Sequence, residues 1–183
     1  MHVIKLLLSD YKKYKKYGGN FISIVFFTQG FWALLQYRIA HVVYNLKIPV
    51  IKQLLQLLML FWQKGIEITT GISIPASVKI GHSFYIGHFG GIIINAKAVI
   101  GNNCNISQGV TIGVSGLGEK RGIPIVGNNV YIGANSVLVG KITIADDVLI
   151  GACSLVNTNT NAKAVMLGVP AIKVSDKGSE GYI

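Results

Sequence analysis

The residues best suited to chemistry in this 183-residue chain form the segment Gly87-His88-Phe89-Gly90-Gly91. An imidazole can take a proton from a hydroxyl group near neutral pH, and two glycines beside it allow a backbone or a ligand to approach closely. A second segment, residues 113–124 (GVSGLGEKRGIP), is rich in glycine and carries the adjacent cations Lys120 and Arg121. The alternative for His88 is a surface histidine at a tolerated bulge, and its spacing alone leaves both interpretations open.

Other reactive side chains are too few or too scattered for several kinds of site. The histidines, at positions 2, 41, 82 and 88, form no cluster with carboxylates or thiols of the kind that holds a metal, so we expect no metal. The two cysteines, Cys104 and Cys153, are expected to be reduced thiols packed in the fold. Nucleic-acid-binding motifs are absent from the sequence, so we expect no nucleic-acid partner.

A repeat of six residues occupies the second half of the chain. Aliphatic residues recur every six positions in three runs, which are Ile74 to Ile86, Ile94 to Ile112 and Val126 to Val156. Neither an amphipathic helix nor a simple alternating strand keeps this period. The pattern predicts one short strand and one corner per repeat and three repeats per turn of a parallel β-helix, with the aliphatic side chains stacked inside.

The repeat is interrupted twice, and each interruption coincides with one of the two segments above. Ile86 and Ile94 are eight residues apart rather than six, and the imidazole lies in this gap. Ile112 and Val126 are fourteen residues apart, and the basic loop lies between them. Because a solenoid spends most of its residues on the repeat, its interruptions are where functional loops are expected.

A basic and apolar segment precedes the repeat. Residues 1–64 contain nine Lys or Arg and one acid, Asp10, so they carry +8 of the formal charge of +10. An amphipathic helix is predicted over residues 21–46 and a second helix over residues 50–63, after Pro49. Neither is a convincing membrane span. We expect these helices to pack on the protein's own trimer or to contact an anionic membrane surface, and the sequence does not choose.

The chain is predicted to have three parts: a helical N-terminal extension (1–66), a β-helix domain (67–160) and a C-terminal tail (161–183). The N-terminus lacks a short apolar core followed by a small-residue cleavage site, so no signal peptide is expected. We therefore place the protein in the cytoplasm, with the inner face of the cell membrane as an open alternative.

Six stretches of the chain follow the pattern of a known family. They are Gly71-Ile72-Ser73-Ile74-Pro75, Lys79-Ile80-Gly81, Gly87-His88, Gly91-Ile92-Ile93-Ile94, Ser107-Gln108-Gly109-Val110-Thr111-Ile112-Gly113 and Gly168-Val169-Pro170-Ala171. Through them, residues 65–175 resemble the hexapeptide-repeat acyltransferases, and within these the serine O-acetyltransferase type. The resemblance implies a mainly β fold, namely a left-handed parallel β-helix with an N-terminal α-helical extension, assembled as a homotrimer.

The resemblance also implies that acetyl-CoA, as co-substrate, binds between neighbouring subunits and that His88 is the general base. The activated acceptor oxygen would attack the thioester carbonyl directly, and the backbone N–H of Gly109 or Gly113 would stabilise the oxyanion. The pantetheine arm is expected beside the small residues Ala134 and Ala152. The candidate cations for its phosphates are Lys120, Arg121 and Lys173.

Two departures from the serine-specific pattern bear on the acceptor. The family's aspartate, which orients the histidine, falls on Ser73, and the family's second active-site histidine falls on Ile123. Ser73 and Asn95 are the candidate acceptor-binding residues, although a corner asparagine such as Asn95 is more often structural.

The remaining pattern is similar to that of the branch that acetylates sugars. It combines a single histidine, a Gly-Ile-Pro loop exit, a basic N-terminal extension and the tail segment Lys177-Gly178-Ser179. We predict acetyl transfer to a sugar hydroxyl in surface or capsular polysaccharide, with a small-molecule or lipid-linked sugar as acceptor. One alternative is a serine O-acetyltransferase of cysteine biosynthesis, and another is a non-catalytic solenoid that binds a membrane surface or scaffolds a complex.

Overall fold

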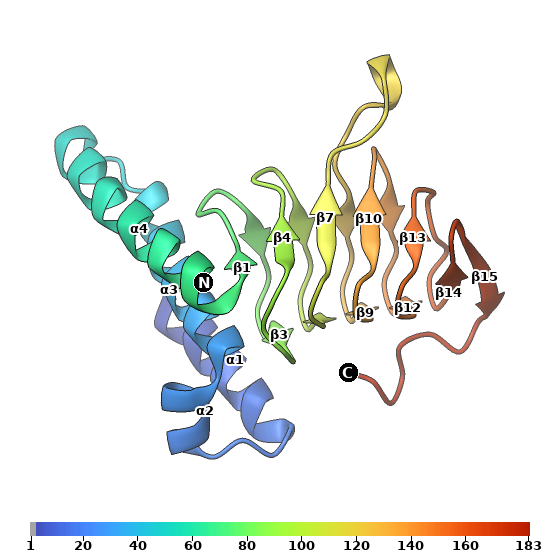
Figure 1. Cartoon of the computed structure of the whole chain (residues 1–183), viewed down its shortest axis with the longest axis horizontal. Coiled ribbons are helices and arrows are strands. Elements are labelled where there is room, and N and C mark those ends of the chain that lie inside the picture. The colour runs from blue at the N-terminus through green and yellow to red at the C-terminus, as the bar shows by residue number, and fades with distance from the viewer. Residues whose placement is uncertain (1–2) are drawn as a thin grey trace.

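The computed structural model describes residues 3–183, a helical N-terminal part followed end-on by a β-helix (Figure 1). The helices are α1 (Val3–Lys16), α2 (Phe21–Phe27), α3 (Gln29–Tyr44) and α4 (Pro49–Thr70). Asn20 and Ser23 form a reciprocal capping box at the start of α2, and Gly71 ends α4 in the left-handed conformation (φ +66°). Within the described residues, no helix combines the length and the apolar character needed to cross a membrane.

Two helix ends differ from the sequence prediction. Thr28 has an extended backbone (φ −111°, ψ 100°), so residues 21–46 form two helices rather than one. The last helix continues to Thr70, seven residues beyond the predicted end at residue 63, because no helix-breaking residue precedes Gly71 except Gly65. The chain therefore enters the β-helix directly from a helix of 22 residues.

The β-helix consists of short strands in three sheets. Sheet A has the order β1-β4-β7-β10-β13, sheet B the order β11-β8-β5-β2 and sheet C the order β15-β14-β12-β9-β6-β3. All neighbours are parallel except β14 and β15. The strands are β1 (Ile72–Ser73), β2 (Lys79–Ile80), β3 (Tyr85–Ile86), β4 (Ile92–Ile94), β5 (Val99–Ile100), β6 (Asn105–Ile106), β7 (Thr111–Gly113), β8 (Ile125–Val126), β9 (Tyr131–Ile132), β10 (Val137–Val139), β11 (Thr143–Ile144), β12 (Leu149–Ile150), β13 (Leu155–Val156), β14 (Val165–Gly168) and β15 (Ala171–Ser175).

The strand register confirms the repeat of six. Ile94 pairs with Ile112, 18 residues further on, which is three repeats per turn. All thirteen aliphatic repeat positions are at most 8% exposed. The interruptions lengthen a turn without disturbing this stack: Ile80 pairs with Ile100, 20 residues on, and Ile100 pairs with Val126, 26 residues on. The extra residues are therefore accommodated at corners, outside the core.

The helices cover the open N-terminal end of the β-helix. Tyr37 of α3 donates its hydroxyl to the Val78 carbonyl (2.8 Å) and accepts the Ile80 N–H (3.2 Å) at the edge of β2. Tyr14 of α1 donates to the Ile86 carbonyl (3.1 Å) and accepts the Ile86 N–H (3.2 Å) at the edge of β3. Because an unpaired strand edge invites association, these hydroxyl groups provide a finished end to the solenoid.

A buried ion pair fastens the same end. The Arg38 guanidinium donates to Asp10 at 2.8 and 3.1 Å, and also to the carbonyls of Ile80 and Gly81. Asp10 in turn accepts the Phe84 N–H at 2.9 Å. Both charged groups are nearly inaccessible to water (2% and 0% exposed), so they join α1 and α3 to the first coil rather than contribute to the surface charge.

The C-terminal tail, residues 176–183, leaves β15 and runs back along sheet C toward the helices (Figure 1). The Ser179 N–H donates to the Asp147 carbonyl (2.9 Å), and the Asn105 amide donates to the Tyr182 carbonyl (2.9 Å). Lys16 of α1 then donates to the Ile183 carbonyl (2.8 Å). The tail thus links the far end of the β-helix to the N-terminal part.

Candidate active site

His88 lies at the corner between β3 and β4, in the first interruption of the repeat. Its side chain is exposed, and its ring has no hydrogen-bond partner among residues 3–183. Gly90 and Gly91, with φ of +100° and +66°, lead the backbone into β4 through conformations that other residues rarely adopt. A free imidazole in this position can act as a base toward a bound hydroxyl group.

The corner that carries His88 continues along the β-helix as a column of small residues. Backbone N–H groups donate to carbonyls of the preceding turn at 2.8, 2.9 and 2.8 Å; the pairs are Gly109 to Gly90, Asn135 to Gln108 and Cys153 to Ala134. The structure therefore brings the predicted residues Gly109, Ala134 and Ala152 to the same corner as His88. Because the Gly109 N–H already donates within the column, it is not free for the oxyanion role suggested by the sequence.

A groove of about 720 Å³ lies between this corner and the C-terminal tail. Ala134 and Ala152 line it on the side of the corner, and Leu149 contributes an apolar surface. The tail contributes Lys177 and Tyr182, to which the sequence analysis assigned no binding role because their position over the groove depends on how the tail folds back. A largely apolar groove with a cation at its edge suits an extended arm that ends in a phosphate.

Lys120 and Arg121 lie at a different corner, between sheets A and B. They belong to an arm that projects from the β-helix between β7 and β8 (Figure 1). Ser115 and Gly122 pair across the base of the arm at 3.2 and 3.0 Å, and the short 3₁₀ helix η1 (Gly118–Lys120) forms part of it. Both cations are exposed, and neither lines the groove of its own chain.

Three other predicted residues also lie away from the groove. Gly113 ends β7 at the base of the arm. Lys173, in β15, pairs with Asp176 at 2.6 Å. Asn95 follows β4, and its side-chain oxygen accepts the Lys97 N–H at 3.0 Å, which is the structural alternative considered for this residue.

Ser73, on the outer face of β1, contacts a carboxylate that the sequence analysis missed. Ser73 Oγ donates to Glu67 Oε1 at 2.7 Å, and Gln63 and Lys64 also donate to Glu67. Partial burial acts to raise the pKa of Glu67, but hydrogen bonds from Lys64, Ser73 and Gln63 outweigh it and hold that pKa below its ordinary value. Glu67 lies in the last turns of a helix, where nothing in the sequence pattern indicated a contact with β1.

The remaining reactive groups do not add a second centre. Burial raises the pKa of the Cys104 thiol to about 11, which leaves it protonated and a poor nucleophile at neutral pH. In the part of the chain that the structure describes, no three His, Cys, Asp or Glu side chains are grouped so that they could hold a metal ion. His88 is therefore the side chain with the clearest chemical potential.

Comparisons with known proteins agree on one kind of relative. Residues 123–158 match the family model described as bacterial transferase hexapeptide (six repeats). The chain is 33% identical to the serine acetyltransferase of Synechococcus elongatus, over 82% of this chain and 59% of that protein. It is 34% identical to the serine acetyltransferase of Helicobacter pylori, over 78% of this chain and 79% of that protein.

The fold of the chain is also that of solved serine acetyltransferases. A serine acetyltransferase in complex with CoA superposes with a TM-score of 0.80, at 29% identity, over 94% of this chain and 69% of that one. The predicted left-handed β-helix of hexapeptide repeats with an N-terminal helical part is confirmed.

These relatives contradict the predicted sugar acceptor, since they are serine acetyltransferases and the comparisons favour that alternative. The sugar prediction was wrong because it gave weight to the missing aspartate at position 73. The structure shows a carboxylate at that place after all, contributed by Glu67 and bound to Ser73. The departure at this position therefore does not indicate a different class of acceptor.

The predicted contact of residues 1–64 with an anionic membrane is corrected as well, because nothing in the relatives or the structure supports it. Two of the nine basic side chains in this segment point into the protein. Lys13 donates to Asn103 Oδ1 at 2.6 Å, and Arg38 pairs with Asp10. The charge of the segment therefore overstates the charge of its surface.

Proposed function

The chain belongs to the serine acetyltransferase family of hexapeptide-repeat transferases, and on this basis we propose that it transfers the acetyl group of acetyl-CoA to the hydroxyl group of L-serine. The observation that carries the proposal is an identity of 33–35% with serine acetyltransferases over 78–82% of the chain. The exposed imidazole of His88, at a glycine-rich corner of the matching fold, supplies the chemical group that such a reaction needs.

His88 acts as the general base in this proposal. The imidazole removes the proton from the serine hydroxyl group, and the serine oxygen attacks the thioester carbonyl. The resulting imidazolium returns the proton to the departing thiolate, so no acyl-enzyme is needed. Cys104, buried and protonated, is unsuited to form one.

The groove beside the His88 corner is the proposed site for acetyl-CoA. The small side chains of Ala134 and Ala152 leave room for the pantetheine arm, and Leu149 gives it an apolar surface. Lys177, from the tail, is within the same groove and replaces Lys173 as the cation proposed for a phosphate.

A homotrimer is the proposed assembly. Exposed apolar side chains lie on the outer faces of sheets A and B and on the arm, namely Ile93 (55%), Ile125 (51%) and Leu117 (87%). Three copies around an axis would bury such residues. The arm of one copy, with Lys120 and Arg121, would then reach toward the groove of a neighbour, which it does not reach in its own chain.

The three parts of the chain have separate roles in this proposal. Residues 1–66 close one end of the solenoid, residues 67–160 carry His88, and residues 161–183 cover the groove. Free Cys104 and Cys153 suit a reducing compartment, so we place the activity in the cytoplasm.

The test is an acetyl-transfer assay with the purified chain. Acetyl-CoA and L-serine are incubated with the protein, and free CoA thiol is measured with a thiol reagent. We expect thiol release that saturates with L-serine, and only background release with L-alanine, which is the same amino acid without the hydroxyl group. Equal release with both amino acids, or none with L-serine, would contradict the proposal.

A further inference from the structure

Glu67 is an anchored carboxylate at the junction between α4 and β1. Its side chain is 20% exposed and accepts hydrogen bonds from Ser73 Oγ (2.7 Å) and Gln63 Nε2 (2.9 Å), besides its ion pair with Lys64. Three donors to one carboxylate are more than a helix surface requires. The arrangement fixes a negative charge directly behind the Ser73 hydroxyl group.

The Ser73 hydroxyl group is left with its acceptor capacity unused. A serine hydroxyl has one proton and two lone pairs, and Ser73 gives its proton to Glu67. A hydroxyl group that donates to a carboxylate is also a stronger acceptor for another donor. Ser73 is only half-buried, on the outer face of β1, so this acceptor is available to a neighbouring side chain.

The turn that carries His88 is packed against the segment that contains Ser73. The Ile92 N–H donates to the Gly71 carbonyl at 3.1 Å, and Ser73 pairs with Ile93. A Cβ atom added to Gly71 would lie 3.1 Å from Gly90 Cα, so the backbones of the two segments are in close approach. The His88 ring, as described above, has no hydrogen-bond partner among residues 3–183.

We infer that Glu67, acting through the Ser73 hydroxyl group, is a positioning residue for the His88 imidazole. Ser73 Oγ accepts the N–H of one ring nitrogen, which fixes the neutral tautomer and leaves the other nitrogen free to take the serine proton. The inference rests on the proposed function, in which His88 is the base. It names a carboxylate from the helical part, outside the β-helix itself, as a component of the site.

The central variant is Glu67→Gln, which keeps the size of the side chain and removes its charge. Without the negative charge behind Ser73, the imidazolium is less stabilised, so the pKa of His88 falls. We expect turnover to fall at least about tenfold with the KM for acetyl-CoA unchanged, and the acid limb of the pH–rate profile to move to lower pH.

Two further variants separate positioning from a structural role. If Glu67 acts only through Ser73, the double variant Glu67→Gln with Ser73→Ala loses no more turnover than Ser73→Ala alone. Glu67→Gln with Ser73→Asp, which moves the carboxylate one position closer to the histidine, recovers turnover. The matched control is Ser77→Ala, a serine of the same coil whose hydroxyl group donates to the Ala96 carbonyl (2.8 Å), and it leaves turnover unchanged.

A titration that needs no acceptor distinguishes failure of this inference from failure of the proposed function. The His88 ring is followed by NMR in histidine-labelled full-length protein, with His88→Ala to assign its signal. A lower pKa of His88 in Glu67→Gln, with no change in Ser77→Ala, supports the positioning role even if L-serine proves not to be the acceptor. An unchanged His88 titration in Glu67→Gln overturns the inference, whatever the acetyl-transfer assay shows.

Discussion

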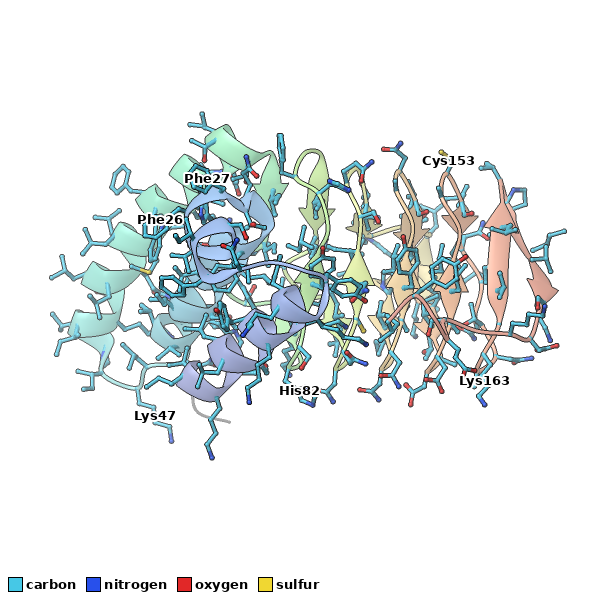
Figure 2. All side chains as sticks on the ribbon, turned by 90° about the horizontal axis from the view of Figure 1, so that it is seen from below. Phe26, Phe27, Lys47, His82, Cys153 and Lys163 are labelled. Carbon is cyan, nitrogen blue, oxygen red and sulfur yellow. The ribbon has the colours of Figure 1, made fainter. Side chains whose placement is uncertain are left out.

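Two corners of the same β-helix, formed by the same six-residue repeat, differ in what their side chains do. At the corner between sheets B and C, polar side chains hydrogen-bond one another from turn to turn. At the corner between sheets C and A, most positions hold small residues, and the imidazole of His88 is free. Figure 2 shows the first corner along the lower edge of the β-helix, at His82 and Lys163, and the second corner at Cys153 on the opposite edge.

The first corner is organised by an asparagine ladder, which consists of Lys13, Asn103, Asn129 and Asp147. Lys13 Nζ donates to Asn103 Oδ1 (2.6 Å), Asn103 Nδ2 to Asn129 Oδ1 (2.8 Å) and Asn129 Nδ2 to Asp147 Oδ1 (2.9 Å). The last three residues have φ of 57°, 54° and 60°, a left-handed conformation that Asn and Asp tolerate better than most residues. A cation at one end and an anion at the other complete the ladder.

The difference shows how one repeat supports both stability and chemistry. A side chain whose hydrogen bonds are satisfied within the fold has little left to offer a substrate, and the asparagine ladder is such a case. The second corner keeps only backbone bonds between its turns, so its surface and the His88 ring remain available. Stability should therefore depend on the first corner and catalysis on the second, and the following changes test this division.

The largest expected effect is loss of turnover in His88→Ala. Removal of the general base should lower kcat by about 100- to 10,000-fold, with the thermal unfolding midpoint unchanged. The matched control is His82→Ala at the first corner, where the ring is exposed and contacts only Ser83 Oγ (3.1 Å). Comparable losses in both variants, or near-normal turnover in His88→Ala, would show that the two corners do not differ in this way.

The next effect is a loss of stability in Asn129→Ala. This change removes the acceptor of Asn103 and the donor to Asp147 and places alanine in a left-handed conformation, so we expect unfolding to become easier by about 2 kcal/mol. Asn135→Ala at the second corner, also left-handed (φ 59°) but without a ladder, should cost less. Unfolding midpoints in denaturant give the comparison, and kcat of Asn129→Ala is expected to match the unaltered protein. A larger loss in Asn135→Ala would reverse the assigned roles.

A smaller effect is expected from filling the groove. Ala134→Leu adds apolar volume where the pantetheine arm is proposed to lie, so the KM for acetyl-CoA should rise about tenfold while the KM for L-serine stays the same. Ala162→Leu, at an exposed position that does not line the groove, is the control. Steady-state kinetics with each substrate varied in turn provide the measurement. An equal rise in both KM values would mean that the groove does not hold acetyl-CoA specifically.

Most of the architecture was predictable because the repeat is a local property of the sequence. The stack from Ile74 to Val156 could be identified from spacing alone, since each strand repeats the same burial pattern. The position of His88 at a corner followed from the same spacing. The helix ends were less accessible, because the break at Thr28 and the extension to Thr70 depend on how the helices pack on the first coil.

Parts of the site that depend on contacts between distant segments were not predictable. Glu67 contacts Ser73 only because α4 ends where β1 begins, and no spacing rule indicates that a helical carboxylate replaces one missing from a strand. Lys177 enters the groove because the tail folds back along sheet C. The sequence suggested Lys173 instead, but that side chain pairs with Asp176. Long-range packing, rather than local pattern, determines these positions.

The smallest effect concerns the cationic end of the asparagine ladder. Burial lowers the pKa of Lys13 from 10.5 to about 8, with Lys16, Asp10 and Cys104 as the neighbouring ionisable groups. Between pH 8 and 10.5 the folded protein has released the Lys13 proton while the unfolded chain still binds it, so this residue makes stability rise with pH in that window, on the order of 1 kcal/mol per pH unit. Lys13→Met removes the contribution, whereas Lys12→Met, at an exposed position of the same helix, retains it. Unfolding midpoints at pH 7.5 and 9.5 should therefore differ between Lys13→Met and the unaltered protein in their pH dependence, not only in their level. If the two proteins showed the same pH dependence, Lys13 would not be held at the end of the ladder as a buried cation, and the first corner would be stabilised by its asparagines and Asp147 alone.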